Sequence, residues 1–219
     1  MLLPAAAVVI AASLAGADIG TNRMRELATS RYGPVAAERV EAWHAMMSRA
    51  GMQSESDQLE VVNSFFNRVT RFDDDQLVWK QPDYWASPLE TLGMAAGDCE
   101  DFAIAKYVSL RLLGVPTQRL RLIYVRAEIG GPGSGVSQAH MVLGYYATPD
   151  AEPLVLDNLI SSIRPGSRRP DLFPVFSFTD DGLWVSGAKA SSADPTTRLS
   201  RWRDVLERMR KEGFALDSP

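Results

Sequence analysis

The hydrophobic period of this 219-residue chain changes once, near Arg119, and that change limits the folds that the chain can adopt. Upstream, apolar residues recur at spacings of three and four over residues 35–50 and 56–72, which is typical of amphipathic helices. Downstream, apolar and polar side chains alternate over residues 119–124, which is typical of a strand. Further strands are predicted over residues 139–146, 153–156, 173–178 and 183–185. Helices followed by strands predict an α+β fold with an antiparallel sheet.

The composition is that of a globular protein, and it argues against several classes of function. Hydrophobic residues make up 46% of the chain, and 23 Lys and Arg against 27 Asp and Glu give a net charge of −4. Disorder would require lower hydrophobicity and a larger net charge. Nucleic-acid binding would require more Lys and Arg to contact phosphates. The single cysteine excludes an intramolecular disulfide and a cysteine-based zinc site.

The first 17 residues predict an export signal. They are rich in Ala, Val and Leu, and the small residues at their end suit a signal peptidase, although no Lys or Arg precedes the apolar stretch. That stretch is too short for a membrane span, which needs roughly 20 residues. We therefore expect an exported protein that has no membrane span after the signal is removed.

The rest of the chain divides into three parts by composition. Residues 18–30 are polar and predict a tether, and residues 31–187 hold the expected domain. Residues 188–219 predict a linker followed by an amphipathic helix, which starts near Pro195 and ends before Gly213. The polar face of this last helix has an excess of Arg, which is typical of a face exposed to solvent.

The only cysteine begins a segment that is almost continuously apolar. This segment runs from Cys99 to Leu113 and is followed by Gly114 and Pro116, a pattern that predicts a central, mostly buried helix. Asp98 suits the N-cap, so Cys99 falls in the first turn, where the helix dipole favours a thiolate. The alternative is a small core residue. Its charged neighbours and an oxidising compartment argue instead that the thiol is used.

Three carboxylates flank this thiol, at Asp98, Glu100 and Asp101. Capping and dipole complementarity would explain acids in a first turn without any further function. Carboxylates beside a nucleophile, however, raise its pKa and oppose the effect of the dipole. A cation bound by the carboxylates would remove this conflict, and oxygen ligands favour Ca²⁺.

A histidine and an aspartate are expected to lie next to each other in the predicted sheet. His140 is near the start of one strand and Asp157 follows the end of the next, so a hairpin makes them neighbours. Asp157 can then orient the imidazole, and Cys99 completes a nucleophile, a base and an orienting group. The alternative is a sheet histidine and a turn-forming aspartate. The other histidine, His44, is expected to be a half-exposed helical residue.

The segment between the second helix and Cys99 has no sustained period, but it holds several aromatic residues. Trp79, Tyr84 and Trp85 either line a cleft or belong to the core. Aromatic residues in such a segment, which carries Pro82 and Pro88 and no regular apolar spacing, are more often core, so the core is the favoured interpretation.

Four blocks of this sequence occur in the same order in a known family. They are the residues from Gly97 to Lys106, Gln138 to Leu143, Leu156 to Asn158, and Tyr84 to Glu90. Together they make the sequence similar to the bacterial transglutaminase-like cysteine proteases of the LapG type, over roughly residues 32–187. The resemblance implies a papain/transglutaminase-like fold, with N-terminal helices and a central Cys-bearing helix packed on an antiparallel sheet.

The resemblance also implies a function. It implies a calcium-dependent periplasmic endopeptidase that cuts the N-terminal region of a large repeat adhesin after a di-alanine, which leads to biofilm release. The periplasmic domain of an inner-membrane cyclic-di-GMP receptor would be its inhibitor. Cys99, His140 and Asp157 match the family's triad, and Asp98 and Glu100 match its calcium ligands, with Asp101 as a further candidate.

Two other functions remain open from the sequence. The same triad could transfer an acyl group to an amine, as a transglutaminase-like acyltransferase, and sequence alone does not separate this from hydrolysis. The chain could also be a non-catalytic binding module with a vestigial site, although the intact Cys, His and Asp argue against this.

Overall fold

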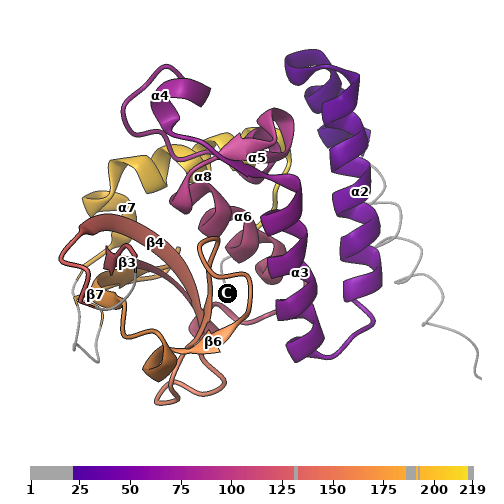
Figure 1. The fold of residues 1–219 in the computed structure, drawn as a ribbon. Helices are drawn as coiled ribbons and strands as arrows, with labels where there is room; N and C mark the ends of the chain where they lie inside the picture. The colour runs from indigo at the N-terminus through magenta and orange to yellow at the C-terminus, as the bar shows by residue number, and fades with distance from the viewer. Residues whose placement is uncertain (1–21, 131–132, 186–190, 192, 217–219) are drawn as a thin grey trace, which may run out of the picture.

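The computed structural model describes residues 22–130, 133–185, 191 and 193–216. Helices occupy the first half of the chain and the main sheet follows, as the change of period predicts (Figure 1). The predicted export signal, residues 1–17, and most of the predicted linker over residues 188–194 lie outside the described residues. Among the helices that are described, none is both long and apolar enough to cross a bilayer.

The N-terminal helices form at capping signals that the sequence carries. They are α2 (Pro34–Ala50), α3 (Glu55–Val69), α4 (Asp75–Val78), α5 (Pro88–Met94) and α6 (Cys99–Leu112). The Ser54 hydroxyl accepts the Asp57 N–H at the start of α3, and Ser87 and Glu90 form a reciprocal capping box at the start of α5. Helices α2 and α3 pack against each other, and α3 also packs against α6.

The tether predicted over residues 18–30 is wrong for the part that the structure describes. Residues 22–32 are helical, and Met24 and Ala28 on this helix are buried in the core. The helix is also tied to the other end of the chain, because Arg31 pairs with Glu212 at 2.8 Å. Its apolar residues Met24, Leu27, Ala28 and Tyr32 do recur at helical spacing and pack on the core, but the surrounding polar residues concealed this short stripe.

The main sheet has six strands in the order β6-β5-β4-β3-β7-β8, and all neighbours are antiparallel. The strands are β3 (Leu120–Glu128), β4 (Ser137–Tyr145), β5 (Leu154–Leu156), β6 (Arg164–Pro165), β7 (Leu172–Phe178) and β8 (Leu183–Val185), with short 3₁₀ turns η1 (Thr117–Arg119) and η2 (Gly166–Arg168). Five of these strands match predicted ones: four to within two residues at each end, whereas β3 extends four residues beyond the strand predicted over residues 119–124. A separate parallel pair joins β1 (Arg71–Phe72) to β2 (Ala96–Gly97).

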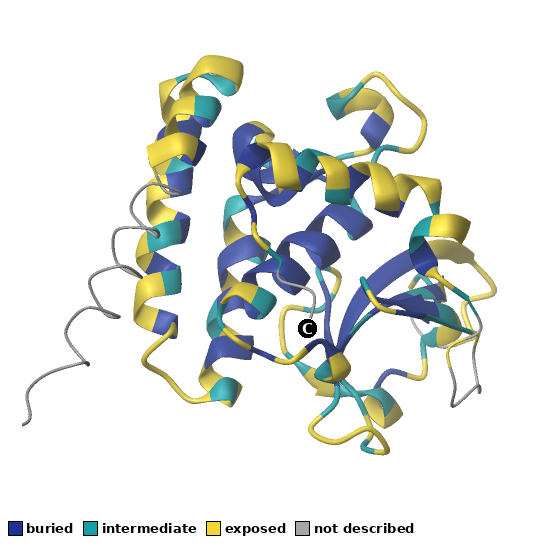
Figure 2. Cartoon of the chain, turned by 180° about the vertical axis from the view of Figure 1, so that it is seen from behind, coloured by how far each residue is buried: buried dark blue, intermediate teal, exposed yellow. Residues whose placement is uncertain are grey.

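Helix α6 is the centre of the fold. Every residue from Glu100 to Leu110 is buried, and the helix stands out as continuously dark blue in Figure 2. One side of α6 packs on β3 and β4, and the other on α3 and α5. This arrangement holds the first turn of α6, and with it Cys99, at a fixed position beside the sheet.

The C-terminal segment is part of the same core. The single helix predicted from Pro195 is interrupted at Leu199, whose non-helical backbone separates α7 (Pro195–Arg198) from α8 (Ser200–Glu212). Trp202 of α8 is fully buried, and its indole N–H donates to the Thr179 carbonyl at 3.1 Å. Gly213 ends α8 with a φ of 96°. The segment therefore belongs to the domain predicted over residues 31–187 and does not stand apart from it.

Candidate active site

A cavity of about 240 Å³ opens where the start of α6 meets the sheet. Cys99 and His140 both line it, so the structure brings together two of the three predicted catalytic side chains. Its remaining lining residues are Asp75, Pro82, Asp83, Trp85, Asp98, Glu100, Tyr124, Ala139 and Met141. The cavity thus combines a thiol, an imidazole, several carboxylates and two aromatic walls.

Cys99 is the first residue of α6, as predicted. Its Sγ donates to Glu100 Oε2 at 3.0 Å, and the backbone N–H of Met141 on β4 points to the sulfur. Burial raises the pKa of this thiol well above its usual range, and the charges of Glu100 and Asp98 raise it further. The expected conflict between the thiol and its acidic neighbours is therefore present in the folded protein.

The predicted hairpin places His140 beside Asp157. Leu143 of β4 lies opposite Leu156 of β5, so Asp157 emerges one residue beyond the pairing, close to His140. The distance between His140 Nε2 and Asp157 Oδ1 is 2.8 Å, and both side chains are buried. This confirms that the two residues are neighbours. Because Asp157 engages Nε2, Nδ1 is the ring nitrogen left to serve a thiol.

Asp157 is contacted through both of its oxygens, Oδ1 by hydrogen bonds and Oδ2 by an ion pair. Its Oδ1 also accepts the Leu159 N–H at 3.1 Å, and its Oδ2 pairs with Arg169 Nη2 at 2.7 Å. Burial alone would raise the pKa of Asp157, but the hydrogen bond and charge of His140, together with Arg169, lower it to about 2. The carboxylate is therefore ionised at neutral pH and can stabilise an imidazolium.

The three predicted metal ligands gather with two carboxylates that the sequence did not reveal, the buried Asp75 and the exposed Asp83. Candidate ligand atoms of Asp75, Asp98 and Asp101 lie within 4.8 Å of one another, as do those of Asp75, Asp83 and Glu100. The parallel pairing of β1 with β2 sets Phe72 beside Gly97, and this brings the start of α4 to the start of α6. A two-residue parallel pair has no periodic signal in the sequence.

The oxygens of this acidic cluster, which we define as Asp75, Asp98, Glu100 and Asp101, are poorly compensated. One oxygen each of Asp75, Asp98 and Asp101 is buried without a hydrogen-bond partner: Oδ1, Oδ1 and Oδ2. A Cβ at Gly97 would lie 2.3 Å from Asp101 Oδ2, so only glycine leaves that oxygen room. Burial first, and then Glu100, raises the pKa of Asp98 to about 8. Burial also raises the pKa of Asp75, to about 6.

This chemistry fits a hard divalent cation. Unpartnered, converging carboxylate oxygens are the ligands that Ca²⁺ prefers, and a cation would lower the pKa values that burial has raised. The structure corrects one detail of the prediction, because Asp98 occupies the N-cap but its side chain makes no capping hydrogen bond. Asp101 is fully buried, and its Oδ1 accepts the Ala86 N–H at 2.7 Å.

The aromatic residues before α6 have different roles. Trp85 lines the cavity and stacks on Phe178, with ring centroids 5.6 Å apart. Trp79 and Tyr84 contact each other with ring centroids 4.6 Å apart and planes tilted by 34°, and they do not line the cavity. The second aromatic wall is Tyr124 on β3, the last residue of the strand predicted over residues 119–124. His44 is half-buried on α2 against Trp43, close to the predicted environment.

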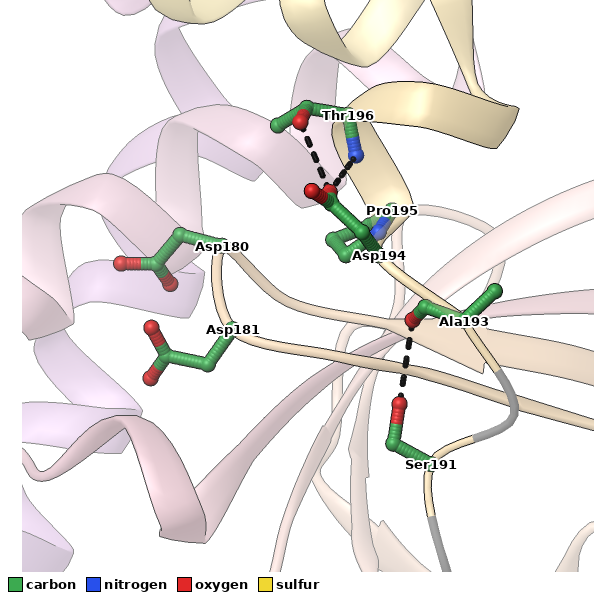
Figure 3. A pocket seen from close by; sticks show the side chains of 7 residues that line it. All are labelled: Asp180, Asp181, Ser191, Ala193, Asp194, Pro195 and Thr196. Atoms are coloured by element: carbon green, nitrogen blue, oxygen red, sulfur yellow. Dashed lines mark hydrogen bonds between the residues drawn. The ribbon is translucent and has the colours of Figure 1, made fainter.

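A larger cavity, of about 560 Å³, lies elsewhere and carries no comparable chemistry (Figure 3). Two of its three carboxylates are already engaged: Asp180 pairs with Arg111 at 2.9 Å, and Asp194 accepts from the backbone N–H and hydroxyl of Thr196. Neither a thiol nor an imidazole is among its lining residues. The smaller cavity at Cys99 is therefore the candidate active site.

Comparison with known proteins agrees with this assignment. The family model of the bacterial transglutaminase-like cysteine proteinases matches residues 36–190. The solved structures of Legionella pneumophila LapG in its calcium-bound and EGTA-treated forms are each 39% identical to this chain and cover 86% of it, with 98% and 97% of their own chains covered and TM-scores of 0.73 and 0.74. No curated protein sequence matches the chain significantly. The chain therefore belongs to the bacterial transglutaminase-like cysteine proteinases, and its fold is the papain/transglutaminase-like α+β fold that the sequence predicts.

Proposed function

We propose that this cysteine proteinase is a calcium-dependent endopeptidase whose triad is Cys99, His140 and Asp157. The observation that carries the proposal is the shared cavity of Cys99 and His140, with Asp157 Oδ1 2.8 Å from the far nitrogen of the imidazole. A thiol, a base and an orienting carboxylate in this relation are what acyl transfer from a peptide requires. The match to a proteinase family favours water as the final acceptor.

The residues act in two steps. His140 Nδ1 accepts the Cys99 proton, and the thiolate attacks the scissile carbonyl while N–H groups at the start of α6 face the developing oxyanion. The imidazolium then donates its proton to the leaving amine, and an acyl-enzyme remains on Cys99. In the second step His140 takes a proton from water, the hydroxide attacks the thioester, and the thiol leaves with the proton. Asp157 stabilises the imidazolium throughout.

The acidic cluster would hold the calcium ion. When bound, Ca²⁺ supplies positive charge beside the nucleophile. Its ligands would be Asp75, Asp98, Glu100 and Asp101. The ion would neutralise the charges of Asp98 and Glu100 beside Cys99 and fix the positions of these two side chains. This assignment is supported by LapG, a relative of 39% identity, which has been solved in a calcium-bound and an EGTA-treated form.

We further propose the substrate, partner and location that the family resemblance implies. The substrate is an extended segment near the N-terminus of a large repeat adhesin, and a cavity of only about 240 Å³ between Trp85 and Tyr124 supports small side chains such as alanine at the cut. The inhibitor is the periplasmic domain of an inner-membrane cyclic-di-GMP receptor. Residues 1–17 support export to the periplasm.

The test is cleavage of the adhesin's recombinant N-terminal region by the chain from residue 18 onward, with Ca²⁺, followed by mass analysis of the products. We expect one main cut after a di-alanine, no cut with Cys99→Ala, and no cut in EGTA until Ca²⁺ is restored. Replacing the alanine pair by leucines should slow the cut. Amine-linked products, or equal cutting of the leucine substrate, would contradict the proposal. Adding the soluble receptor domain should inhibit cleavage.

A further inference from the structure

A buried arginine lies directly behind the carboxylate of the proposed triad. Arg169 is 3% exposed, and its Nη2 is 2.7 Å from Asp157 Oδ2, the oxygen that does not face His140. The preceding residue, Arg168, is exposed to solvent. Two consecutive arginines therefore have opposite environments, and sequence reasoning singled out neither of them.

The backbone explains why only Arg169 turns inward. Its N–H donates to Gly166 O at 2.9 Å and closes the short η2 turn. Pro170 follows, and the helical backbone conformation is unfavourable for a residue that precedes proline. Arg169 accordingly leaves the turn with φ −125° and ψ 62°, so the turn ends at Arg168.

We infer that Arg169 is a positioning residue for the Cys–His–Asp machinery, fixing the Asp157 carboxylate so that Oδ1 faces His140. This inference rests on the proposed function. A carboxylate held only through Oδ1 could rotate about its Cβ–Cγ bond, whereas an ion pair on Oδ2 fixes the plane of the group. The guanidinium is itself fixed by Asp171, whose two oxygens lie 3.0 Å from Arg169 Nε and 2.8 Å from Nη2.

The charges of this group favour an imidazolium. Asp157 and Asp171 contribute two negative charges and Arg169 one positive charge, so one net negative charge remains to face His140. Asp171 thereby prevents Arg169 from cancelling the field of Asp157. One other buried cation, Lys106, also acts on Asp157 through its charge, and it holds no hydrogen bond among the described residues. The pairing of Arg169 with both aspartates makes it the group that sets the orientation.

The ring proton of His140 gives a direct readout. An ionised carboxylate only accepts hydrogen bonds, so Asp157 requires the proton of a neutral His140 to be on Nε2. With ¹⁵N-histidine labelling of the calcium-loaded chain, His140 should show this single tautomer and a protected Nε2–H signal. The chain has only two histidines, so His44 serves as an internal reference.

We expect Arg169→Met to lose the protected signal and to mix the two tautomers of His140, with the signals of His44 unchanged. Arg168→Met is the matched control and should resemble the wild type. Arg169→Lys, which keeps the charge but not the planar fork, should restore the signal in part. Adhesin cleavage should follow, with kcat lower by about 10- to 100-fold in Arg169→Met and KM nearly unchanged.

A native His140 signal in folded Arg169→Met would overturn the inference. If Arg169→Met does not fold, Asp171→Asn tests the same point, because it frees the guanidinium without removing it. An unchanged His140 signal and unchanged kcat in Asp171→Asn would then contradict the inference. The spectra need no substrate, so a wild-type chain that fails to cut the adhesin would count against the proposed function and leave this test intact.

Discussion

Two groups of buried carboxylates lie beside the active-site cavity, and they differ in how their negative charge is balanced. Behind His140, Asp157 has hydrogen bonds on Oδ1 and an ion pair with Arg169 on Oδ2, and its pKa is lowered to about 2. At the start of α6, Asp75, Asp98 and Asp101 each keep a buried oxygen that has neither a hydrogen bond nor an ion pair among the described residues. There burial, and then Glu100, raises the pKa of Asp98 to about 8.

The difference separates a carboxylate that the chain itself holds ionised from carboxylates that need charge from outside. Arg169 and His140 provide the compensating groups for Asp157 within the fold. The acidic cluster has no such arginine or lysine partner among the described residues, and burial of uncompensated carboxylates is costly. A bound cation is the compensation that its geometry allows.

The largest expected effect tests the group around Asp157, whose negative charge is balanced within the fold. His140→Ala should lower kcat/KM for adhesin cleavage by roughly 10⁵- to 10⁶-fold, as Cys99→Ala should, because members of a triad act as a unit. His44→Ala is the matched control and should change kcat/KM little, since His44 packs against Trp43 on α2. Inactivation by His44→Ala with an active His140→Ala would show that the wrong histidine has been assigned.

A single carboxylate from each group should respond differently to calcium. Asp157→Asn should lower kcat by roughly 10⁴-fold at every Ca²⁺ concentration, because it disturbs the tautomer of His140. Asp75→Asn should instead lose activity at micromolar Ca²⁺ and regain most of it at millimolar Ca²⁺, because it removes a ligand. Calcium titrations of kcat for the two variants check this. Rescue of Asp157→Asn by calcium would remove the distinction between the two groups.

These expectations could be drawn only in part from the sequence. The buried helix that begins at Cys99 and the hairpin that joins His140 to Asp157 follow from local periodicity and turn residues. Asp75 and Arg169 do not, because a two-residue parallel pair and a single inward turn leave no pattern in the sequence. The helix over residues 22–32 was missed although Met24, Leu27 and Ala28 stand at helical spacing, because the segment is short and mostly polar and its stability depends on packing against the core.

The pH dependence of stability should differ with and without calcium. Without Ca²⁺, the folded protein keeps protons on Asp98, whose pKa is about 8 against an ordinary value of 3.8, and on Asp75, whose pKa is about 6. The unfolded chain releases these protons near pH 4, so stability falls as the pH rises from about 4 to 8. Asp157 acts at lower pH: its stabilisation is present above about pH 4 and is lost as the pH falls to about 2.

Thermal unfolding in EGTA and in Ca²⁺ checks this. In EGTA we expect a Tm lower at pH 8 than at pH 5 by about 3 °C or more, which corresponds to ~1 kcal/mol for a chain of this size. Saturating Ca²⁺ should reverse the order, because calcium binds the ionised carboxylates. Asp98→Asn should flatten the dependence in EGTA. A Tm in EGTA that rises steadily from pH 5 to pH 8 would contradict the account of the acidic cluster.

A second effect on stability, of similar size, concerns Lys106, a buried cation on α6. Burial lowers the pKa of Lys106 from 10.5 to about 7, against the opposing charge of Asp157. The unfolded chain binds this proton up to pH 10.5, so stability rises with pH between about 7 and 10.5. Lys106→Met should raise the Tm at pH 7 by about 3–6 °C, or ~1–2 kcal/mol. The gain should shrink toward pH 10, and a lower Tm at both pH values would show that the charge stabilises Asp157.

Proton release on calcium binding tests the comparison between the two carboxylate groups most directly. Titration calorimetry of Ca²⁺ into the full chain at pH 7, in buffers of different ionisation enthalpy, counts the protons released. We expect tight binding of a single ion with net proton release, because the pKa of Asp98 is about 8 before the ion binds. Asp75→Asn should weaken binding, whereas Asp171→Asn should not. Binding heats that are equal in all buffers, or binding by Asp75→Asn as tight as that of the wild type, would contradict the assignment of the acidic cluster as the calcium site.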